Sequence, residues 1–191
     1  MTELRVLTVR QPWASLIALG HKRIEVRTRP TKYRGWVAIH AAKADTDRTI
    51  LDPQIAPAWD KLGEHIGGNA PTRGAIVGVA RITDSLPIID EERGWTGEGD
   101  TPDDVILVGR CLRELDRYDV SVGYTADLAD QLPYAPADMW TPGHHAWMLD
   151  DVRPLVQPIP HKGGLGLRYA TLDLAQRLAP YCADQPMGAP A

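Results

Sequence analysis

The run from Thr8 to Arg27 constrains the fold most, because two alternating stretches flank a proline and a glycine within twenty residues. Leu4 to Val9 alternates apolar and polar side chains and predicts a strand, which must end before Pro12 because proline cannot donate to a ladder. Residues 13–19 carry a rough helical stripe, and Gly20 suits a left-handed cap at its end. A helix of barely two turns is unstable alone, so tertiary packing must hold it.

A second predicted strand, residues 22–28, carries a cluster of charges. Glu25 and Arg27 lie two residues apart and share one face of that strand, while Lys22 stands at the turn that leads into it. A guanidinium suits phosphate or carboxylate, and a lysine whose pKa falls can act as an acid or a base. Glu25 could accept hydrogen bonds from a base or a sugar hydroxyl, or activate water. The same spacing also fits an ordinary ion-paired strand face, so both interpretations are open.

Net charge is unevenly distributed along the chain. The 191 residues together carry −4, which argues against a uniformly basic nucleic-acid binder. Residues 1–43 nevertheless contain nine Lys or Arg against Glu3 and Glu25, a net charge of +7, and the remaining 148 residues carry −11. A positive N-terminal segment in an acidic chain predicts a local anion site.

The middle of the chain predicts a helix, a strand and an acidic loop in turn. Residues 45–68 have an apolar stripe at helical spacing that ends at two glycines, and residues 74–84 are the most strand-like run. Residues 84–104 hold eight acidic side chains among glycines and predict a surface loop or a lid. Residues 105–118 fit either a helix or a strand, and residues 119–142 predict a segment that wraps the surface.

The C-terminal part predicts a strand over residues 145–155 and a glycine-rich loop over residues 158–166, where the backbone could approach a ligand. A helix is expected over residues 171–178, and residues 181–191 are expected to form a flexible tail. Together with a third strand over residues 36–41, these elements predict an α+β fold, a mixed β-barrel with short flanking helices.

Several functional classes are excluded by what the sequence lacks. Cys111 and Cys182 form no disulfide framework and have no metal-site spacing, so a reducing, cytoplasmic location is expected. His144, His145 and His161 match no metal motif, and no phosphate-loop or dinucleotide fingerprint occurs, so neither a metal nor a cofactor is expected. No apolar signal core and no run of about eighteen apolar residues occurs, so no membrane association is expected.

The opening block has a specific pattern. The letters QPWASLI at residues 11–17 are followed by Gly20 and then by Lys22, Glu25 and Arg27 in the spacing K-x-x-E-x-R. This pattern resembles the ASCH family, which is named after the activating signal cointegrator proteins. Further similar blocks are Tyr33-Arg34-Gly35 with Ile39-His40-Ala41, Ala146-Trp147, and Lys162-Gly163. The resemblance covers roughly residues 4–43, 74–88 and 145–168.

The resemblance implies a PUA-like β-barrel, a single domain over residues 1–180 with insertions at about 45–73 and 89–143. It also implies that the Lys/Glu/Arg set lines a basic cleft for RNA or a modified nucleoside. Small members of the family resemble amidohydrolases that deacetylate N4-acetylcytidine with a Thr three residues after the Lys. Glu25 stands at that position here. The chain is therefore similar to the Glu-bearing, coactivator-like branch, and the small-member mechanism lacks its nucleophile.

Candidate functional residues come from the opening block and from later loops. Trp13 could stack on a nucleobase or lie in the core, and Gln11 could read a base edge or hold a turn. His40 could act as a catalytic acid or be a satisfied strand histidine, and Lys162 beside Gly163 could contact phosphate or be solvated. The predicted catalytic set is Lys22, Glu25 and His40, and the predicted ligand-binding set is Gln11, Trp13, Lys22, Glu25, Arg27, Arg34, Lys162 and Gly163.

Three functions are open from the sequence. The first is binding of RNA or of a nucleotide-like small molecule through the basic cleft. The second is hydrolysis of a modified nucleoside or of RNA, which would make the protein an enzyme. The third is a protein-interaction role of the coactivator type through the acidic residues 84–104. The expected partner is accordingly RNA or a nucleotide, and the sequence indicates no oligomeric state.

Overall fold

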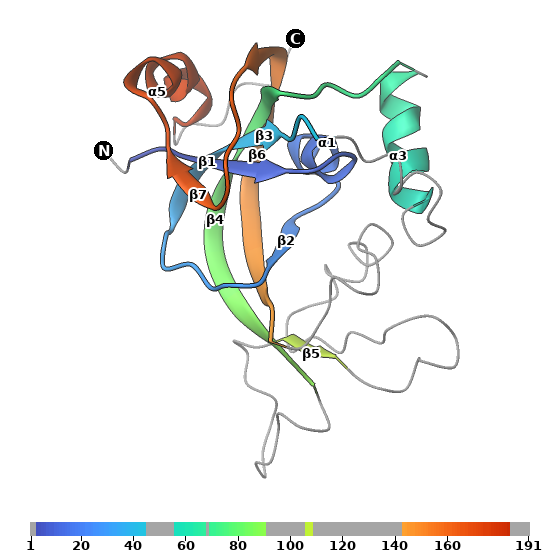
Figure 1. Cartoon of the computed structure of the whole chain (residues 1–191), viewed down its shortest axis with the longest axis vertical. Helices are drawn as coiled ribbons and strands as arrows, with labels where there is room; N and C mark the ends of the chain where they lie inside the picture. The colour runs from blue at the N-terminus through green and yellow to red at the C-terminus, as the bar shows by residue number, and fades with distance from the viewer. Residues whose placement is uncertain (1–2, 45–55, 68, 91–105, 109–142, 184–191) are drawn as a thin grey trace.

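The computed structural model shown in Figure 1 describes residues 3–44, 56–67, 69–90, 106–108 and 143–183. In this part of the chain, short helices surround one sheet. The elements, in chain order, are β1 (Arg5–Val9), α1 (Trp13–Ala18), β2 (Ile24–Arg27), β3 (Gly35–Ala41), α3 (Ala56–Ile66), β4 (Ala75–Asp90), β5 (Ile106–Val108), β6 (His145–Pro160), β7 (Leu167–Tyr169), α5 (Leu172–Leu178) and the 3-10 turn η4 (Ala179–Tyr181).

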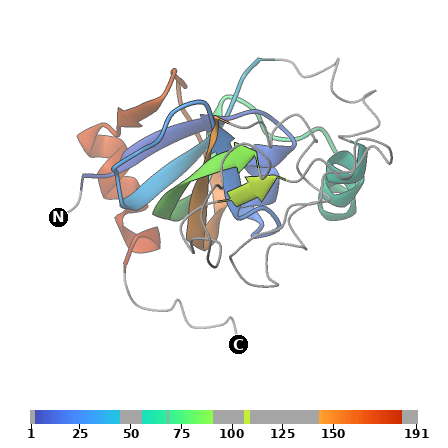
Figure 2. The ribbon, with the colours of Figure 1, turned by 90° about the horizontal axis from the view of Figure 1, so that it is seen from below.

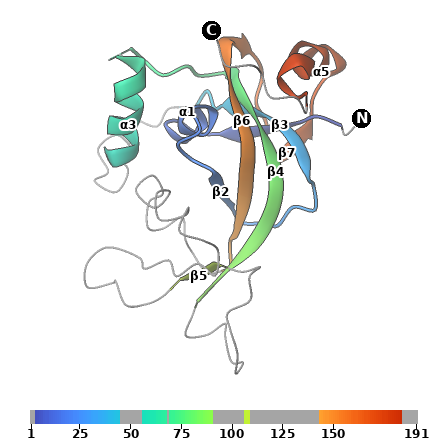
Figure 3. The same cartoon turned by 180° about the vertical axis from the view of Figure 1, so that it is seen from behind.

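The strands form one mixed sheet whose main path runs β2–β6–β4–β3–β1–β7, while β5 pairs with β4 outside this path. β1 pairs with β3 and β5 pairs with β4 in parallel, whereas the other pairings are antiparallel. The long strands β4 and β6 lie side by side through the molecule, as Figures 1 and 3 show. β2 and β7 end the path, and within the described residues the sheet is not closed into a barrel.

The α+β class predicted from the sequence is confirmed, but the expectation of a closed barrel is corrected. Closure would require pairing between the strands at the two ends of the path, β2 and β7. These strands are far apart in the sequence. Alternation and turn residues predict each strand locally, but they carry no information on whether two distant edges meet.

The predicted strand–helix–strand unit is confirmed as β1, α1 and β2. Pro12 stands at the N-cap of α1. Gly20 has a φ of 80°, the left-handed conformation predicted for the end of this helix. Five of the six residues of α1 are buried, so the core holds a helix that is too short to be stable alone.

Buried side chains form two clusters, one on each face of the sheet. Leu7 of β1 belongs to the cluster that contains α1, whereas its neighbour Val6 belongs to the cluster that contains α5. Consecutive residues of a strand point to opposite faces, so β1 contributes to both clusters. Thr171 caps α5 as predicted, because its hydroxyl accepts a hydrogen bond from the Leu174 N–H. Figure 2 shows α5 and α3 on opposite sides of the molecule.

The prediction of a loop over residues 84–104 is wrong in its first part. β4 continues to Asp90 and pairs with β6 as far as Pro87 and His145. Buried Leu86 and Ile88 supply an apolar alternation that the acidic neighbours obscure in the sequence. Residues 91–104 lie outside the described residues, as do residues 109–142 and the predicted tail from residue 184.

β6 also extends further than the predicted strand, to Pro160. β2 pairs with β6 only from residue 145 to residue 148, so the later residues of β6 have β4 as their strand partner. Prolines are tolerated where the N–H side of a strand needs no partner. Separately, no helix among the described residues is both long enough and apolar enough to span a membrane.

Candidate functional site: a buried ion triad behind a cationic groove

Lys22, Glu25 and Arg27, called here the buried triad, form two adjoining ion pairs. Glu25 accepts from Arg27 Nη2 at 2.9 Å and from Lys22 Nζ at 3.3 Å, one cation on each carboxylate oxygen. The Lys22 side chain is 3% exposed and that of Glu25 is 8% exposed, whereas that of Arg27 is 27% exposed. The structure therefore brings together the charged residues of the predicted cleft, but only Arg27 reaches solvent appreciably.

Burial governs the electrostatics of the triad. Removal from water lowers the pKa of the Lys22 ammonium, and the neighbouring Glu25 carboxylate opposes that shift. The positive charge of Arg27 adds a smaller lowering of the same pKa. Lys22 Nζ also donates to the backbone carbonyl of Ile24. The lysine thus depends on internal partners for its charged form, as a buried ammonium must.

Thr8 connects the triad to the glycine-rich loop. Arg27 Nη2 donates to the Thr8 carbonyl at 2.7 Å. On the other side of the same residue, the Thr8 hydroxyl accepts a hydrogen bond from the Gly164 N–H at 3.2 Å. The triad therefore fixes the backbone of a residue whose side chain holds the loop.

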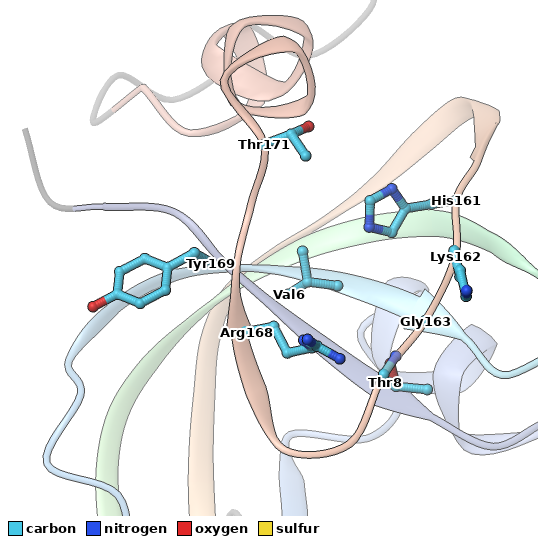
Figure 4. Close-up of a pocket in the computed structure, with 9 residues that line it drawn as sticks. Val6, Thr8, His161, Lys162, Gly163, Arg168, Tyr169 and Thr171 are labelled. Carbon is cyan, nitrogen blue, oxygen red and sulfur yellow. The ribbon is translucent and has the colours of Figure 1, made fainter.

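Two adjoining cavities, called here the cationic groove, line the loop after β6. Their volumes are about 310 and 870 Å³, and they share Thr8 with residues 161–164 as lining. Figure 4 shows the smaller cavity, with the Arg168 side chain extending toward Thr8. Among the described residues, every charged side chain that lines either cavity is cationic. These side chains are Lys43, Arg73, Lys162 and Arg168.

His40 lies buried under the loop, 1% exposed, and its ring lines the larger cavity. Its Nε2 donates to the His161 carbonyl at 3.0 Å, because a carbonyl can only accept. In the neutral ring Nδ1 is then a lone-pair nitrogen, and it is buried without a hydrogen-bond partner among the described residues. Burial lowers the pKa of His40 and keeps the ring neutral, although the bond to His161 opposes the shift.

Gly163 is required by the close approach of the loop to His40 and Thr8. A methyl carbon at Gly163 would lie 2.5 Å from His40 Nδ1 and 3.0 Å from the Thr8 hydroxyl oxygen. Such contacts are shorter than van der Waals separation allows, so any side chain here would displace the loop. The glycine backbone thus lies directly against the buried ring of His40, while its predicted approach to a ligand stays a prediction.

Three predicted ligand-binding residues lie away from the groove or are occupied internally. Gln11 is 1% exposed, and its amide bonds to Ser15 and to the Thr72 carbonyl. Trp13 is 6% exposed and belongs to the core cluster of α1. Arg34 forms an ion pair with Asp84 at 2.5 Å and lines a different cavity. These placements correspond to the turn and core alternatives that the sequence leaves open for Gln11 and Trp13.

The groove residues that are absent from the set predicted from the sequence include Thr8 and three cations, Lys43, Arg73 and Arg168. Alternation predicts only that Thr8 lies in a strand, although its position opposite His40 in the β1–β3 register puts both residues under the loop. Arg168 lies two residues beyond Gly166, and a charge so close to the glycine-rich loop is a usable signal. Lys43 belongs to the cationic N-terminal segment, but nothing in the sequence indicates that it meets Arg73 at one cavity.

Comparisons with known proteins agree with this architecture. The family profile described as ASCH domain matches residues 7–112. The crystal structure of ASCH from Zymomonas mobilis is similar with a TM-score of 0.50 and 12% identity, over 94% of this chain and 96% of that one. A mutant of the same Zymomonas mobilis protein gives a TM-score of 0.49 and 13% identity, over 95% and 98% of the two chains. At such identity the likeness is one of fold alone, and it agrees with the α+β class. No curated protein sequence matched the chain.

Proposed function

The chain belongs to the ASCH domain family, and from that premise we propose that its cationic groove binds RNA or a nucleotide through the phosphates. The match to the family profile confirms the resemblance seen in the opening block. The assignment of the chain to the Glu-bearing branch of the family stays a prediction. The groove, rather than the buried triad, is the proposed contact surface. Lys22 and Glu25 act in this proposal as positioning residues.

One observation carries the proposal, the absence of any carboxylate among the described residues that line the groove. The chain as a whole has a net charge of −4, so a concave surface whose described charged residues are all cationic is not a product of composition. Cationic side chains and glycine backbone N–H groups together suit phosphate oxygens. Because the rest of the chain is acidic, anions are attracted to this groove and repelled elsewhere. This favours binding at one specific site over non-specific binding.

The triad supports the groove from behind. Arg27 holds the Thr8 carbonyl at 2.7 Å, and Glu25 holds Arg27 at 2.9 Å. Thr8 in turn accepts from the Gly164 N–H, which keeps the loop over His40. A mispositioned Thr8 would therefore disturb the groove without removing any of its cations.

Equilibrium binding of a fluorescent RNA oligonucleotide, measured by anisotropy over a series of salt concentrations, tests the proposal. Lys162→Ala and Arg168→Ala should each weaken binding and reduce the slope of log K against log salt by about 0.7, the value per phosphate contact on a single strand. Arg177→Ala is the matched control, since Arg177 is an exposed arginine of α5 paired with Asp173. If wild type binds neither RNA nor nucleotides, or if all three variants behave alike, the proposal fails.

A second candidate function is hydrolysis of RNA or of a modified nucleoside, favoured by the state of His40. His40 lines the larger cavity, its buried Nδ1 has no hydrogen-bond partner among the described residues, and burial lowers its pKa, so the ring is neutral at pH 7 as a general base must be. Incubation of wild type and His40→Gln with RNA and with N4-acetylcytidine, followed by chromatography, separates the functions. Products formed by wild type but not by the variant would support an enzyme, whereas intact substrates that still bind would support a binding module alone.

A further inference from the structure

We propose that the ring of Tyr169 is a stacking platform for a nucleobase, so that the ligand of the cationic groove is an unpaired RNA strand. This inference rests on the proposed function and adds the form of the ligand to it. It selects a single strand over both a duplex and a free mononucleotide.

Tyr169 presents an open aromatic face that is held in place from behind. The Arg5 guanidinium lies 3.4 Å from the centre of the Tyr169 ring, which covers one face of that ring. Tyr169 is nevertheless 63% exposed, so the opposite face is open to solvent. Arg5 and Tyr169 are direct partners in the β1–β7 register, so the strands themselves fix this stack.

Arg5 is itself restrained, which makes the platform rigid before any ligand arrives. Its guanidinium lies 5.4 Å from the ring centre of Tyr33 and pairs with Glu3 at 3.8 Å. Tyr33 is anchored through its hydroxyl, which lies 2.8 Å from the Glu3 carbonyl and 2.7 Å from the Trp36 carbonyl and donates its one proton to either of them. A ring fixed in advance loses little freedom when a base stacks on it, so more of the stacking energy appears as affinity.

The platform adjoins the phosphate-binding residues. Arg168 and Tyr169 are consecutive in β7, and Figure 4 shows Arg168 reaching into the groove while the Tyr169 ring points to the other side of the strand. β7 ends the strand path, so its outer edge has no described strand beside it. A chain whose phosphate meets Arg168 can therefore pass over this edge and place the next base on Tyr169.

The chemistry of the platform selects an unpaired strand. A ring that stacks needs a base with a free face, and bases inside a helix are already stacked on their neighbours. A mononucleotide has only one phosphate-bearing unit. It therefore cannot place a phosphate in the groove and the base of the next nucleotide on the platform, as a strand can. Cationic grooves flanked by aromatic rings are the general solution for single strands, because every base has a stacking face.

The test compares a fluorescent RNA hexamer, the same hexamer in a duplex, and uridine monophosphate as competitor. Wild type should prefer the single strand to the duplex. Tyr169→Ala should weaken single-strand binding by between about 5-fold and 150-fold, the range that corresponds to loss of one stacked base. Duplex and mononucleotide binding should be unchanged. Tyr169→Phe should keep wild-type affinity because the ring is retained.

Leu172→Ala is the matched control, since Leu172 is an exposed apolar residue, 75% exposed, that does not line the groove. Equal binding of single strand and duplex by wild type would overturn the inference and leave the proposed function standing. The inference is overturned in the same way if Tyr169→Ala, folded by circular dichroism, binds the hexamer like wild type. Failure of every nucleic acid and nucleotide to bind wild type would instead overturn the proposed function itself.

Discussion

Lys22 and Lys162 are the same residue type in opposite circumstances. Lys22 is 2% exposed and pairs with Glu25, and its pKa is lowered by burial. Lys162 is exposed and lines a groove that, among the described residues, contains no carboxylate. A buried cation already has its counter-ion, so it contributes to structure, whereas a cation without one is available to an external anion. We therefore expect the triad to position the backbone and the groove to contact the ligand.

The largest expected effect concerns the triad. Glu25→Gln keeps the shape of the side chain but leaves buried Lys22 without its carboxylate. We expect the free energy of unfolding to fall by about 3–5 kcal/mol, the usual cost of removing one partner from a buried ion pair. Urea denaturation at pH 7 measures it. Glu64→Gln, which breaks an exposed pair with Lys61, is the control and should change little. A loss as small as that of the control would mean that the triad is not a structural centre.

Two neighbouring glycines sharpen the comparison inside the groove. Gly163→Ala places a methyl group against the buried His40 ring and should cost about 1–3 kcal/mol of stability and weaken RNA binding. Gly164→Ala meets the end of the Arg168 side chain at 2.5 Å, which can swing away, so the cost in stability should be smaller. Thermal unfolding compares the stability of the two variants, and RNA titration compares their affinity. Equal losses at the two positions would contradict the view that His40 fixes the loop.

The third expectation is a pH dependence that belongs to His40. Burial lowers the pKa of His40 in the folded protein below its ordinary value, so the unfolded chain binds more protons below pH 6.5. The stability contribution is complete above pH 6.5 and is lost as the pH falls toward the folded pKa, by at most about 1.4 kcal/mol per pH unit. Unfolding of wild type and His40→Gln between pH 7 and 5 should show a steeper loss for wild type. Parallel curves would show that His40 does not cause the pH dependence of stability.

The smallest effect is expected at Arg34, a predicted ligand-binding residue. Its pair with Asp84 is 42% and 45% exposed, and exposed pairs contribute about 0–1 kcal/mol. Arg34→Ala should therefore change stability little, and it should leave RNA affinity unchanged because Arg34 does not line the groove. The same anisotropy titration checks the affinity. A clear loss of affinity would restore the role predicted from the sequence and extend the contact surface beyond the groove.

Local patterns predict local structure well in this chain. The alternation before Pro12 and the glycine at position 20 correctly bound β1 and α1, and Thr171 correctly marks the start of α5. These signals work because each depends on residues within one turn or one strand. The acidic residues after Asp84 mislead for the same local reason, since charge density conceals the buried Leu86 and Ile88.

The site is predictable in part. The spacing of Glu25 and Arg27 places both on one strand face, and their ion pair agrees with that geometry. The depth of burial cannot be predicted, because it depends on Trp147 and other residues of β6 that pair with β2 across more than a hundred positions. Thr8 and Arg168 escape prediction for a related reason, since their meeting at one cavity depends on the register between β1 and β7.

Thr8 has a consequence for hydrogen exchange. Its carbonyl accepts from Arg27 and its hydroxyl accepts from the Gly164 N–H, so one residue is shared between the buried triad and the groove proposed to bind a ligand. The coupling free energy between the two hydrogen bonds of Thr8 is reciprocal. A ligand that stabilises the bond to Gly164 therefore stabilises the bond to Arg27 by the same factor. The exchange rate of the Gly164 amide is therefore expected to report both on the proposed occupancy of the groove and on the integrity of the buried triad.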